Sequence, residues 1–494
     1  MGERTQNTGT FLRGLPKKAM GLIGGQEVLA YSFAIFGSSM VSALLGSALS
    51  FFYTEVLFLS TAAVGTIFLV ARIWDAVNDP VMGVIVDRTH TKWGKCVPYL
   101  RYAPIPLFFI SVLMFLPIVN LPLATKTVLA GVFYILFDIF FTAVEIPLQG
   151  LQPLLFIDQQ ERNKAVSVSS TLGSTGTILP GGLYFALVLL VGGSEKSPMG
   201  NFVVATALVG IGCVCMMASS RHLKEKITPP AVEKASASSF FQTVKPLFKN
   251  KPLLILLLVG LFNGVTNLAG NSLVYFCTWN YADTGLGTAL LFPLLQITSG
   301  ASWMLSILCV PFLLKHFGKK RLFIAACAAG ALINAGLYVI GYQSIWLYLV
   351  IKFFSNFPGG VVATLTNLMT SDSIEYAEWK TGERTEGVTF SVTKLIGKIS
   401  SAAISALTMF MLSFVNYNSE AMQATQAAGG SIARTYPQVL NMIFMLTTLS
   451  LTVAFILQII PMLFYKFEGE FQENMLEELK ERRAAAQNDQ EAAT

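Results

Sequence analysis

The sequence is poor in charge and in the residues from which catalytic and metal sites are usually built. Only 13% of its 494 residues are Asp, Glu, Lys or Arg, against roughly 25% in soluble domains. Its three histidines (His90, His222 and His316) lie in basic segments, and its six cysteines have no metal-site or disulfide spacing. We expect no enzyme active site, metal centre or cofactor. The net charge of +6 does not indicate a nucleic-acid partner.

Long apolar stretches fill most of the chain, which is 53% hydrophobic with a mean hydropathy of +0.60. The first twenty residues lack the apolar core of a secretory signal peptide, so we expect none. Backbone groups in lipid must be satisfied internally, which favours helices. At about 20 residues per span, the chain is predicted to be an all-α membrane protein of twelve transmembrane helices: 28–53, 60–86, 99–119, 122–149, 164–192, 199–219, 252–277, 287–313, 320–341, 345–370, 387–415 and 437–465.

A polar segment at 221–251 divides these spans into six and six. Short basic turns that contain glycine follow span two (Gly83–Lys95) and span eight (Lys315–Arg321). Such turns also occur in unrelated loops, but their equivalent positions predict two six-helix bundles of the major facilitator fold. The expected domains are therefore an N-terminal bundle (1–220), a cytoplasmic linker (221–251), a C-terminal bundle (252–465) and a tail (466–494) that forms a solvated helix. Basic residues cluster in alternate loops, which places both termini in the cytoplasm.

Span two carries three charges at mid-membrane, where each costs at least ~3 kcal/mol. Arg72, Asp75 and Asp79 are spaced i, i+3 and i+7 and therefore share one helix face. Asn78 and Pro80 flank the second carboxylate. The two carboxylates can bind a small hard cation or share a proton. The alternative is a structural ion-pair network that holds the helix to its neighbours.

Other spans add polar and charged residues. Span four carries Thr142 and Glu145, and span eleven carries Lys394 and Lys398 one turn apart. Lys398 is expected to counter the span-two carboxylates, whereas Lys352 of span ten either lines the cavity or reaches the interface along its apolar stem. With span two, these residues make four basic and three acidic side chains. This surplus of one positive charge favours an anionic substrate.

Several uncharged polar residues could line a sugar site. Ser39 lies in span one, Gln149 ends span four, Ser170 opens span five and Tyr275 lies in span seven. Hydroxyls, amides and aromatic faces are what a sugar ring requires. The alternative for each residue is interhelical hydrogen bonding, because small and polar residues join helices in membranes.

The span-two segment Ala71–Gly83, the turn Asp87–Lys95 and the stretch Ser371–Gly387 before span eleven resemble those of the glycoside–pentoside–hexuronide:cation symporters. The resemblance covers nearly the whole chain. It implies a plasma-membrane carrier that couples a cation to a glycoside or hexuronide by alternating access. It also implies that Asp75 and Asp79 hold the cation beside Asn78 and Thr142, with Lys398 as the basic partner. Glu145 falls where family members have a sugar-binding aspartate.

The chain departs from the melibiose-carrying branch of that family at four positions. Ser39 replaces an aspartate, Ser170 an arginine and Gln149 a tryptophan of the sugar site. Lys394 replaces a threonine of the sodium site, where an ammonium group would repel sodium. We therefore predict a substrate other than melibiose. Of the two possible coupling ions, H+ and Na+, we predict proton coupling, or independence of sodium, over coupling to sodium.

The resemblance also suggests a cytoplasmic gate of ion pairs. Its members would be Asp87 and Arg88 after span two, and Asp372, Glu375 and Arg384 in the loop before span eleven. A plain topology signal is the alternative for these charges. Alternative functions are transport of a lysolipid or another amphipathic substrate by the same fold, and sugar sensing without transport. We expect a monomer in the lipid bilayer.

Overall fold

The computed structural model of the chain describes residues 25–156, 159–226, 250–285, 287–381 and 386–469, and short stretches between 471 and 482. The regular structure of these residues is helical, apart from one isolated bridge between Thr91 and Gly94. They form two compact units. Unit 1 comprises Met1–Leu49, Ile73–Leu121 and Val128–Glu233, and unit 2 comprises Ser50–Arg72, Pro122–Thr127 and Lys234–Thr494.

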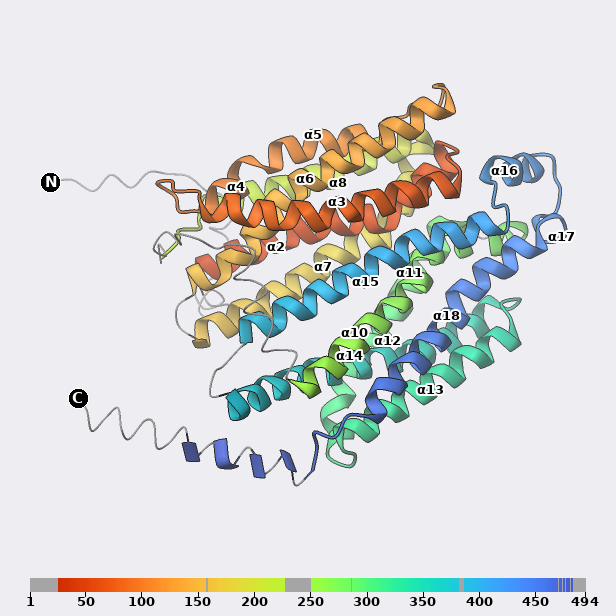
Figure 1. The fold of residues 1–494 in the computed structure, drawn as a ribbon. Coiled ribbons are helices and arrows are strands. Elements are labelled where there is room, and N and C mark those ends of the chain that lie inside the picture. The colour runs from red at the N-terminus through yellow and green to blue at the C-terminus, as the bar shows by residue number, and fades with distance from the viewer. Residues whose placement is uncertain are drawn as a thin grey trace. The chain divides into compact units, whose positions relative to one another are not determined.

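The helices of the first part of the chain form unit 1, except for short segments that belong to unit 2 (Figure 1). Helix α2 packs against α7 and α8, and α5 also packs against α8. Two π-helical stretches, η1 and η2, extend α2. The elements are α2 (Gln26–Leu44), η1 (Leu45–Leu49), η2 (Phe52–Val56), α3 (Thr61–Asp87), α4 (Val97–Tyr102), α5 (Pro104–Met114), α6 (Leu123–Leu155), α7 (Gln159–Gly192) and α8 (Pro198–Ser220).

The helices that follow the linker form the bulk of unit 2. Helix α13 packs against α14 and α18, and α12 packs against α14. A core of apolar side chains joins α10, α13, α14 and α18. The elements are α10 (Lys251–Asn263), η4 (Gly264–Thr266), α11 (Asn267–Tyr275), η5 (Phe276–Asn280), η6 (Ala282–Thr284), α12 (Thr288–Leu314), α13 (Lys319–Ile340), α14 (Ile345–Thr381), α15 (Glu386–Phe414), α16 (Ser419–Ala427), α17 (Ile432–Thr435) and α18 (Pro437–Leu463).

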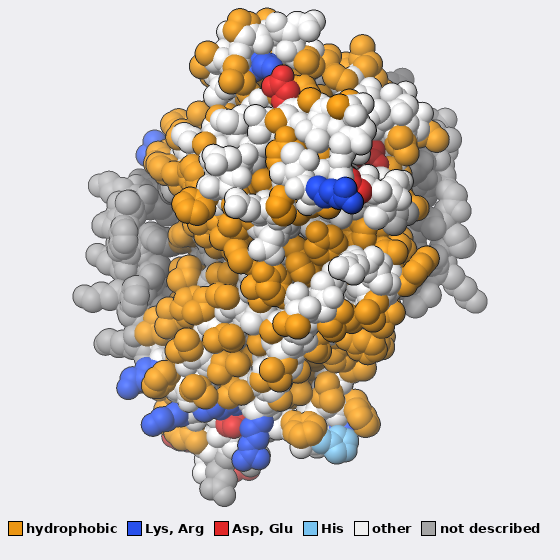
Figure 2. Space-filling view, turned by 90° about the vertical axis from the view of Figure 1, so that its right-hand side faces the viewer, with side chains coloured by type: hydrophobic (Ala, Val, Ile, Leu, Met, Phe, Trp, Pro, Cys, Tyr) orange, Lys and Arg blue, Asp and Glu red, His pale blue; other side chains and the backbone are white. Residues whose placement is uncertain are grey.

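Apolar side chains cover much of the helix surface. Ten helical spans among the described residues are long and apolar enough to cross a bilayer. Large apolar side chains point outward from them, with Leu190 82% and Val339 84% exposed. Hydrophobic side chains cover much of the face drawn in Figure 2, and Lys and Arg side chains on it are few. The protein is therefore a multi-pass membrane protein. The two other predicted spans correspond to α3, which carries the mid-span charges, and to the shorter pair α4 and α5.

Helix starts follow the sequence. Ser197 caps α8, since its Oγ accepts a hydrogen bond from the Gly200 N–H (3.1 Å), and Pro198 occupies the first turn. Asn250 caps α10 in the same way through the Leu253 N–H (3.1 Å). In both cases a side-chain oxygen satisfies a backbone donor that the helix itself leaves free.

Helices α2 and α7 approach so closely that only glycine fits at one contact. A Cβ on Gly176 would lie 2.5 Å from the backbone oxygen of Phe36. A Cβ on Gly182, six residues further along α7, would have no neighbouring atom within 4 Å. The two glycines therefore differ only in what surrounds them, and they provide a matched pair.

We predict that Gly176→Ala destabilises the protein by about 1–3 kcal/mol through overpacking. Gly182→Ala should be neutral or slightly stabilising, because alanine favours a helix. Thermal unfolding of both variants in detergent measures the difference. Equal unfolding temperatures would show that the α2–α7 contact is looser than described.

The structure changes two expectations about the polar segments. Ser371–Gly387 was expected to be a loop, but α14 continues through Thr381. The tail was expected to be a solvated helix; its described residues are helical and mostly exposed, but Met475 is buried against the apolar core of unit 2. Trp379 Nε1 donates to Glu478 Oε2 (2.8 Å), and Arg482 Nη1 donates to the Trp379 oxygen (3.0 Å). The tail thus supplies hydrogen-bond partners for the end of α14.

Candidate functional site

The carboxylates of α3 lie well inside unit 1. Asp75 is 5% exposed, and Asp79 is half-buried. The Thr142 hydroxyl of α6 donates to Asp79 Oδ1 at 3.3 Å. The structure therefore brings together two of the residues that the sequence assigned to the cation site. The side-chain nitrogen of Asn78, one residue before Asp79, is buried without a hydrogen-bond partner among the described residues.

Helix α6 presents further polar groups along the face that carries Thr142. Glu145 is half-buried, and its Oε1 accepts a hydrogen bond from Gln149 Nε2 (3.1 Å). This pair of predicted substrate residues is in contact, and Gln149 is exposed. A carboxylate with an amide beside it can accept and donate hydrogen bonds to sugar hydroxyls.

Sequence reasoning missed Asp138, which lies one helical turn before Thr142 and two turns before Glu145 on α6. Its Oδ2 is buried. The signal was available, because Asp138, Thr142 and Glu145 are spaced i, i+4 and i+7 and therefore share one helix face. Asp138 also corrects the charge count, since a fourth acidic residue balances the four basic ones. The count that favoured an anionic substrate was therefore incomplete.

The other predicted substrate residues of unit 1 have different surroundings. Ser39 lies where α2 packs against α7, and its Oγ would be 3.3 Å from a Cβ on Gly173. Ser170 is exposed on α7, and its backbone oxygen accepts a hydrogen bond from Ser174. Ser39 therefore fits the close helix contact as well as it fits a sugar site.

Residues of unit 2 were assigned by the sequence as well. Lys352 is buried (5% exposed), and its Nζ donates to the Thr447 oxygen (3.2 Å), so it does not reach a membrane interface. Tyr275 is fully buried, and its hydroxyl contacts Thr54 Oγ1 (3.1 Å). Lys398 is half-buried on α15, and its pairing with the α3 carboxylates stays a prediction. The side chain of Lys394 lies outside the described residues, and Arg72 is half-buried in α3.

Two of the predicted gate residues form ion pairs with lysines of the glycine turns. Asp87 pairs with Lys95 (2.7 Å), and Asp372 pairs with Lys319 (2.5 Å). Arg88 is exposed and Glu375 is half-buried, while Arg384 lies outside the described residues. The ion pairs are partly exposed, so each contributes little to stability.

At each glycine turn a glutamate accepts hydrogen bonds from backbone N–H groups at the start of the next helix, a feature that the sequence analysis did not find. Glu225 accepts hydrogen bonds from the N–H groups of Lys95 (3.0 Å), Cys96 (2.7 Å) and Val97 (3.1 Å) at the start of α4. Burial raises the pKa of the Cys96 thiol to about 12, and the Glu225 carboxylate adds to the shift. Gly94 is left-handed (φ 103°), and a Cβ there would overlap the Glu225 carboxylate.

Unit 2 repeats this arrangement. Glu468 accepts a hydrogen bond from the Lys320 N–H (3.1 Å) at the start of α13, beside Gly318. Glu225 and Glu468 each lie five residues beyond the end of a helix, α8 and α18 respectively. The two basic turns noted in the sequence therefore have the same structural partner in each unit.

Comparison with known proteins identifies the family of this chain. Residues 30–469 match the family described as MFS/sugar transport protein. The chain is 29% identical over 469 residues to the isoprimeverose transporter of Lactiplantibacillus pentosus, covering 94% of this chain and 93% of that protein. It is 26% identical to the glucuronide carrier protein homolog of Escherichia coli strain K12, covering 82% of this chain and 87% of the relative.

Solved structures agree at the level of the fold. A D-xylose-proton symporter superposes with a TM-score of 0.59 at 14% identity, covering 90% of this chain and 98% of the other. A point mutant of the nucleoside transporter NupG gives a TM-score of 0.61 at 14% identity, covering 89% of this chain and 100% of the other.

The chain belongs to the MFS/sugar transport protein family, which makes it a transporter and not an enzyme. The resemblance to glycoside–pentoside–hexuronide:cation symporters is confirmed by this match and by its relatives. The predicted major facilitator fold is likewise confirmed.

Proposed function

We propose that the protein is a secondary active transporter that carries a glycoside or hexuronide together with a cation. The observation that carries this proposal is the carboxylate pair of α3, in which Asp75 is buried and the half-buried Asp79 accepts a hydrogen bond from Thr142 of α6. Mid-membrane carboxylates are costly and mark ion pathways. Relatives that are named glycoside/cation symporter and glucuronide carrier support the same cargo class.

The residues divide into two roles in this proposal. Asp75 and Asp79 bind the coupling cation, with Asn78 and Thr142 beside them and Lys398 as the basic partner. Glu145 and Gln149 hydrogen-bond the sugar hydroxyls, and the other predicted substrate residues extend the site. The cation and the sugar must both bind the occluded state more tightly than the other states. Each ligand then raises the affinity of the protein for the other, which is what couples them.

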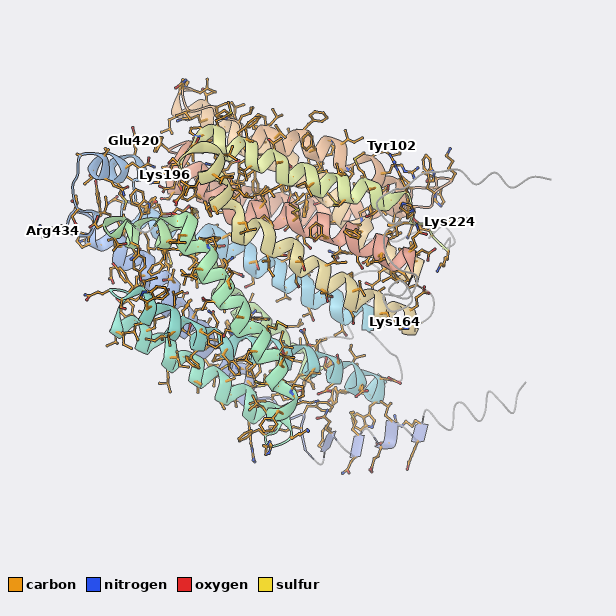
Figure 3. The ribbon with its side chains drawn as sticks, turned by 180° about the vertical axis from the view of Figure 1, so that it is seen from behind. Tyr102, Lys164, Lys196, Lys224, Glu420 and Arg434 are labelled. Atoms are coloured by element: carbon orange, nitrogen blue, oxygen red, sulfur yellow. The ribbon has the colours of Figure 1, made fainter. Side chains whose placement is uncertain are left out.

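We further propose that the cation is a proton rather than sodium, because Lys394 stands where the sodium-coupled members of the family have a threonine. The protein is proposed to be a monomer in the plasma membrane with both termini in the cytoplasm. Figure 3 supports this topology for unit 1, where Lys164 and Lys224 lie at one end and Lys196 at the other. Basic residues are most frequent at the first of these ends, as the positive-inside rule requires.

Purified protein in proteoliposomes tests the proposal. A panel of labelled neutral glycosides and glucuronides would be offered with an imposed pH gradient or an imposed sodium gradient. We expect the pH gradient to drive uptake of at least one sugar. Uptake driven by sodium alone would contradict the role given to Lys394. If neither gradient drives uptake of any sugar, an amphipathic substrate becomes the better hypothesis.

A further inference from the structure

A fully buried carboxylate lies at the end of the helix that α2 begins. Glu55, in η2, is 0% exposed. Its Oε1 accepts hydrogen bonds from the Tyr417 hydroxyl and from Trp279 Nε1 (3.4 Å). Its Oε2 accepts from the Ser419 hydroxyl (2.7 Å) and from Gln423 Nε2 (3.4 Å). Sequence reasoning ended span one at residue 53 and so passed over it.

These donors come from distant parts of the sequence. Trp279 belongs to η5, Tyr417 follows α15, and Ser419 and Gln423 belong to α16. Gln423 Nε2 also donates to the backbone oxygen of Glu55 (2.9 Å), and Trp279 Nε1 donates to the Tyr417 hydroxyl (2.6 Å). Glu55 thus joins a segment that precedes the linker to three segments that follow it.

The surrounding contacts hold the same segment. Thr54 Oγ1 contacts the Tyr275 hydroxyl (3.1 Å), and Lys126 Nζ donates to the Leu57 oxygen (2.7 Å). Ser50–Arg72 accordingly belongs to unit 2, although Gln26–Leu49 of the same continuous helix belongs to unit 1. The change of unit falls between the π-helical stretches η1 and η2. Such stretches are frequent at functional sites.

The chemistry of the cluster suits a contact that must form and break. The hydroxyl, indole and amide donors are neutral, so opening leaves no unpaired cation among them. Hydrogen bonds to a buried carboxylate are stronger than those between neutral groups, and an unpaired buried carboxylate is unfavourable. The cluster therefore favours the closed arrangement, while water can replace every donor once the cluster opens.

We propose that Glu55 is a positioning residue of the transport cycle. It latches Ser50–Arg72 to η5 and α16 on the side of the membrane away from the termini, and it must release this segment for that side to open. The inference rests on the proposed alternating-access function. In this proposal Glu55 influences the equilibrium between the closed and open states, and it contacts neither the sugar nor the cation.

Thiol labelling tests the latch without a substrate. Thr54→Cys places a thiol at a site that is 1% exposed beside Glu55. Intact cells and inside-out vesicles would be treated with a membrane-impermeant maleimide, and labelling of position 54 would be quantified by peptide mass spectrometry. The variants added to Thr54→Cys are Glu55→Gln and Tyr417→Phe. The matched controls are Glu420→Gln, exposed on α16 (Figure 3), and Tyr338→Phe, which loses a hydroxyl bond to Asn441.

We expect Glu55→Gln and Tyr417→Phe to raise labelling from the outer side about tenfold, as loss of one charge-assisted hydrogen bond implies. Labelling from inside-out vesicles should stay low, and the controls should match the parent.

Unchanged labelling in both latch variants would overturn the proposal. Equal increases from both sides would also overturn it, since they indicate general loosening. If Glu55→Gln does not fold, Tyr417→Phe decides alone. Labelling needs no sugar. A failed uptake assay would therefore count against the proposed transport function without deciding whether Glu55 acts as a latch.

Discussion

Asp79→Asn is expected to abolish gradient-driven sugar uptake, with a loss of roughly 100-fold, the upper range of coupling free energies between two sites. The amide keeps the shape of the side chain and can still accept the Thr142 hydrogen bond. It removes the negative charge that a cation needs. Initial uptake rates in proteoliposomes, with and without the imposed gradient, measure the change.

The control for this prediction is Glu420→Gln, which neutralises an exposed carboxylate on α16. It should transport as the parent does. Sugar exchange at equal concentrations should survive in Asp79→Asn, because exchange requires binding and alternation but no net movement of the cation. Full gradient-driven uptake by Asp79→Asn would show that the α3 carboxylate is structural, as the ion-pair alternative holds.

Glu225→Ala is expected to destabilise the protein by about 2–4 kcal/mol. Three backbone N–H groups at the start of α4 would lose their acceptor at once. Each bond to a carboxylate is worth roughly 1.5–3 kcal/mol when buried, and partial exposure reduces that value. Thermal unfolding in detergent, and the yield of folded protein, would report the loss.

The equivalent substitution in unit 2 provides a comparison for the size of this loss of stability. Glu468→Ala removes one such hydrogen bond, from the Lys320 N–H, so its effect should be smaller than that of Glu225→Ala. Glu225→Gln should fall between parent and alanine, because a neutral amide oxygen still accepts hydrogen bonds. If Glu225→Ala unfolds at the parental temperature, the carboxylate does not support the glycine turn.

The fold class was predictable from the sequence because lipid imposes a simple rule. Apolar stretches of helical length must become helices, and most predicted spans agree with observed helices to within a few residues, such as α3 (Thr61–Asp87) against 60–86. The rule says nothing about polar segments outside the membrane. There α14 runs to Thr381, since the tail provides partners for its end.

The candidate site was predictable where charges stand within an apolar run. Asp75 and Asp79 stood out for that reason, and Thr142 followed from the family resemblance. Glu55 was missed because the donors to its carboxylate lie more than 200 residues further along the sequence, a distance that no local pattern spans. The burial of Lys126 likewise has no local sequence signal, since its Nζ donates to the distant Leu57 backbone oxygen.

Ion movement caused by sugar is the most direct test of cation-coupled symport. Proteoliposomes without any ion gradient would receive an inward gradient of a sugar identified in the uptake panel, while a pH electrode follows the outer medium. We predict alkalinisation as protons enter with the sugar, and none with Asp79→Asn. Sugar entry without movement of protons or sodium would contradict the account, because the protein would then be a uniporter.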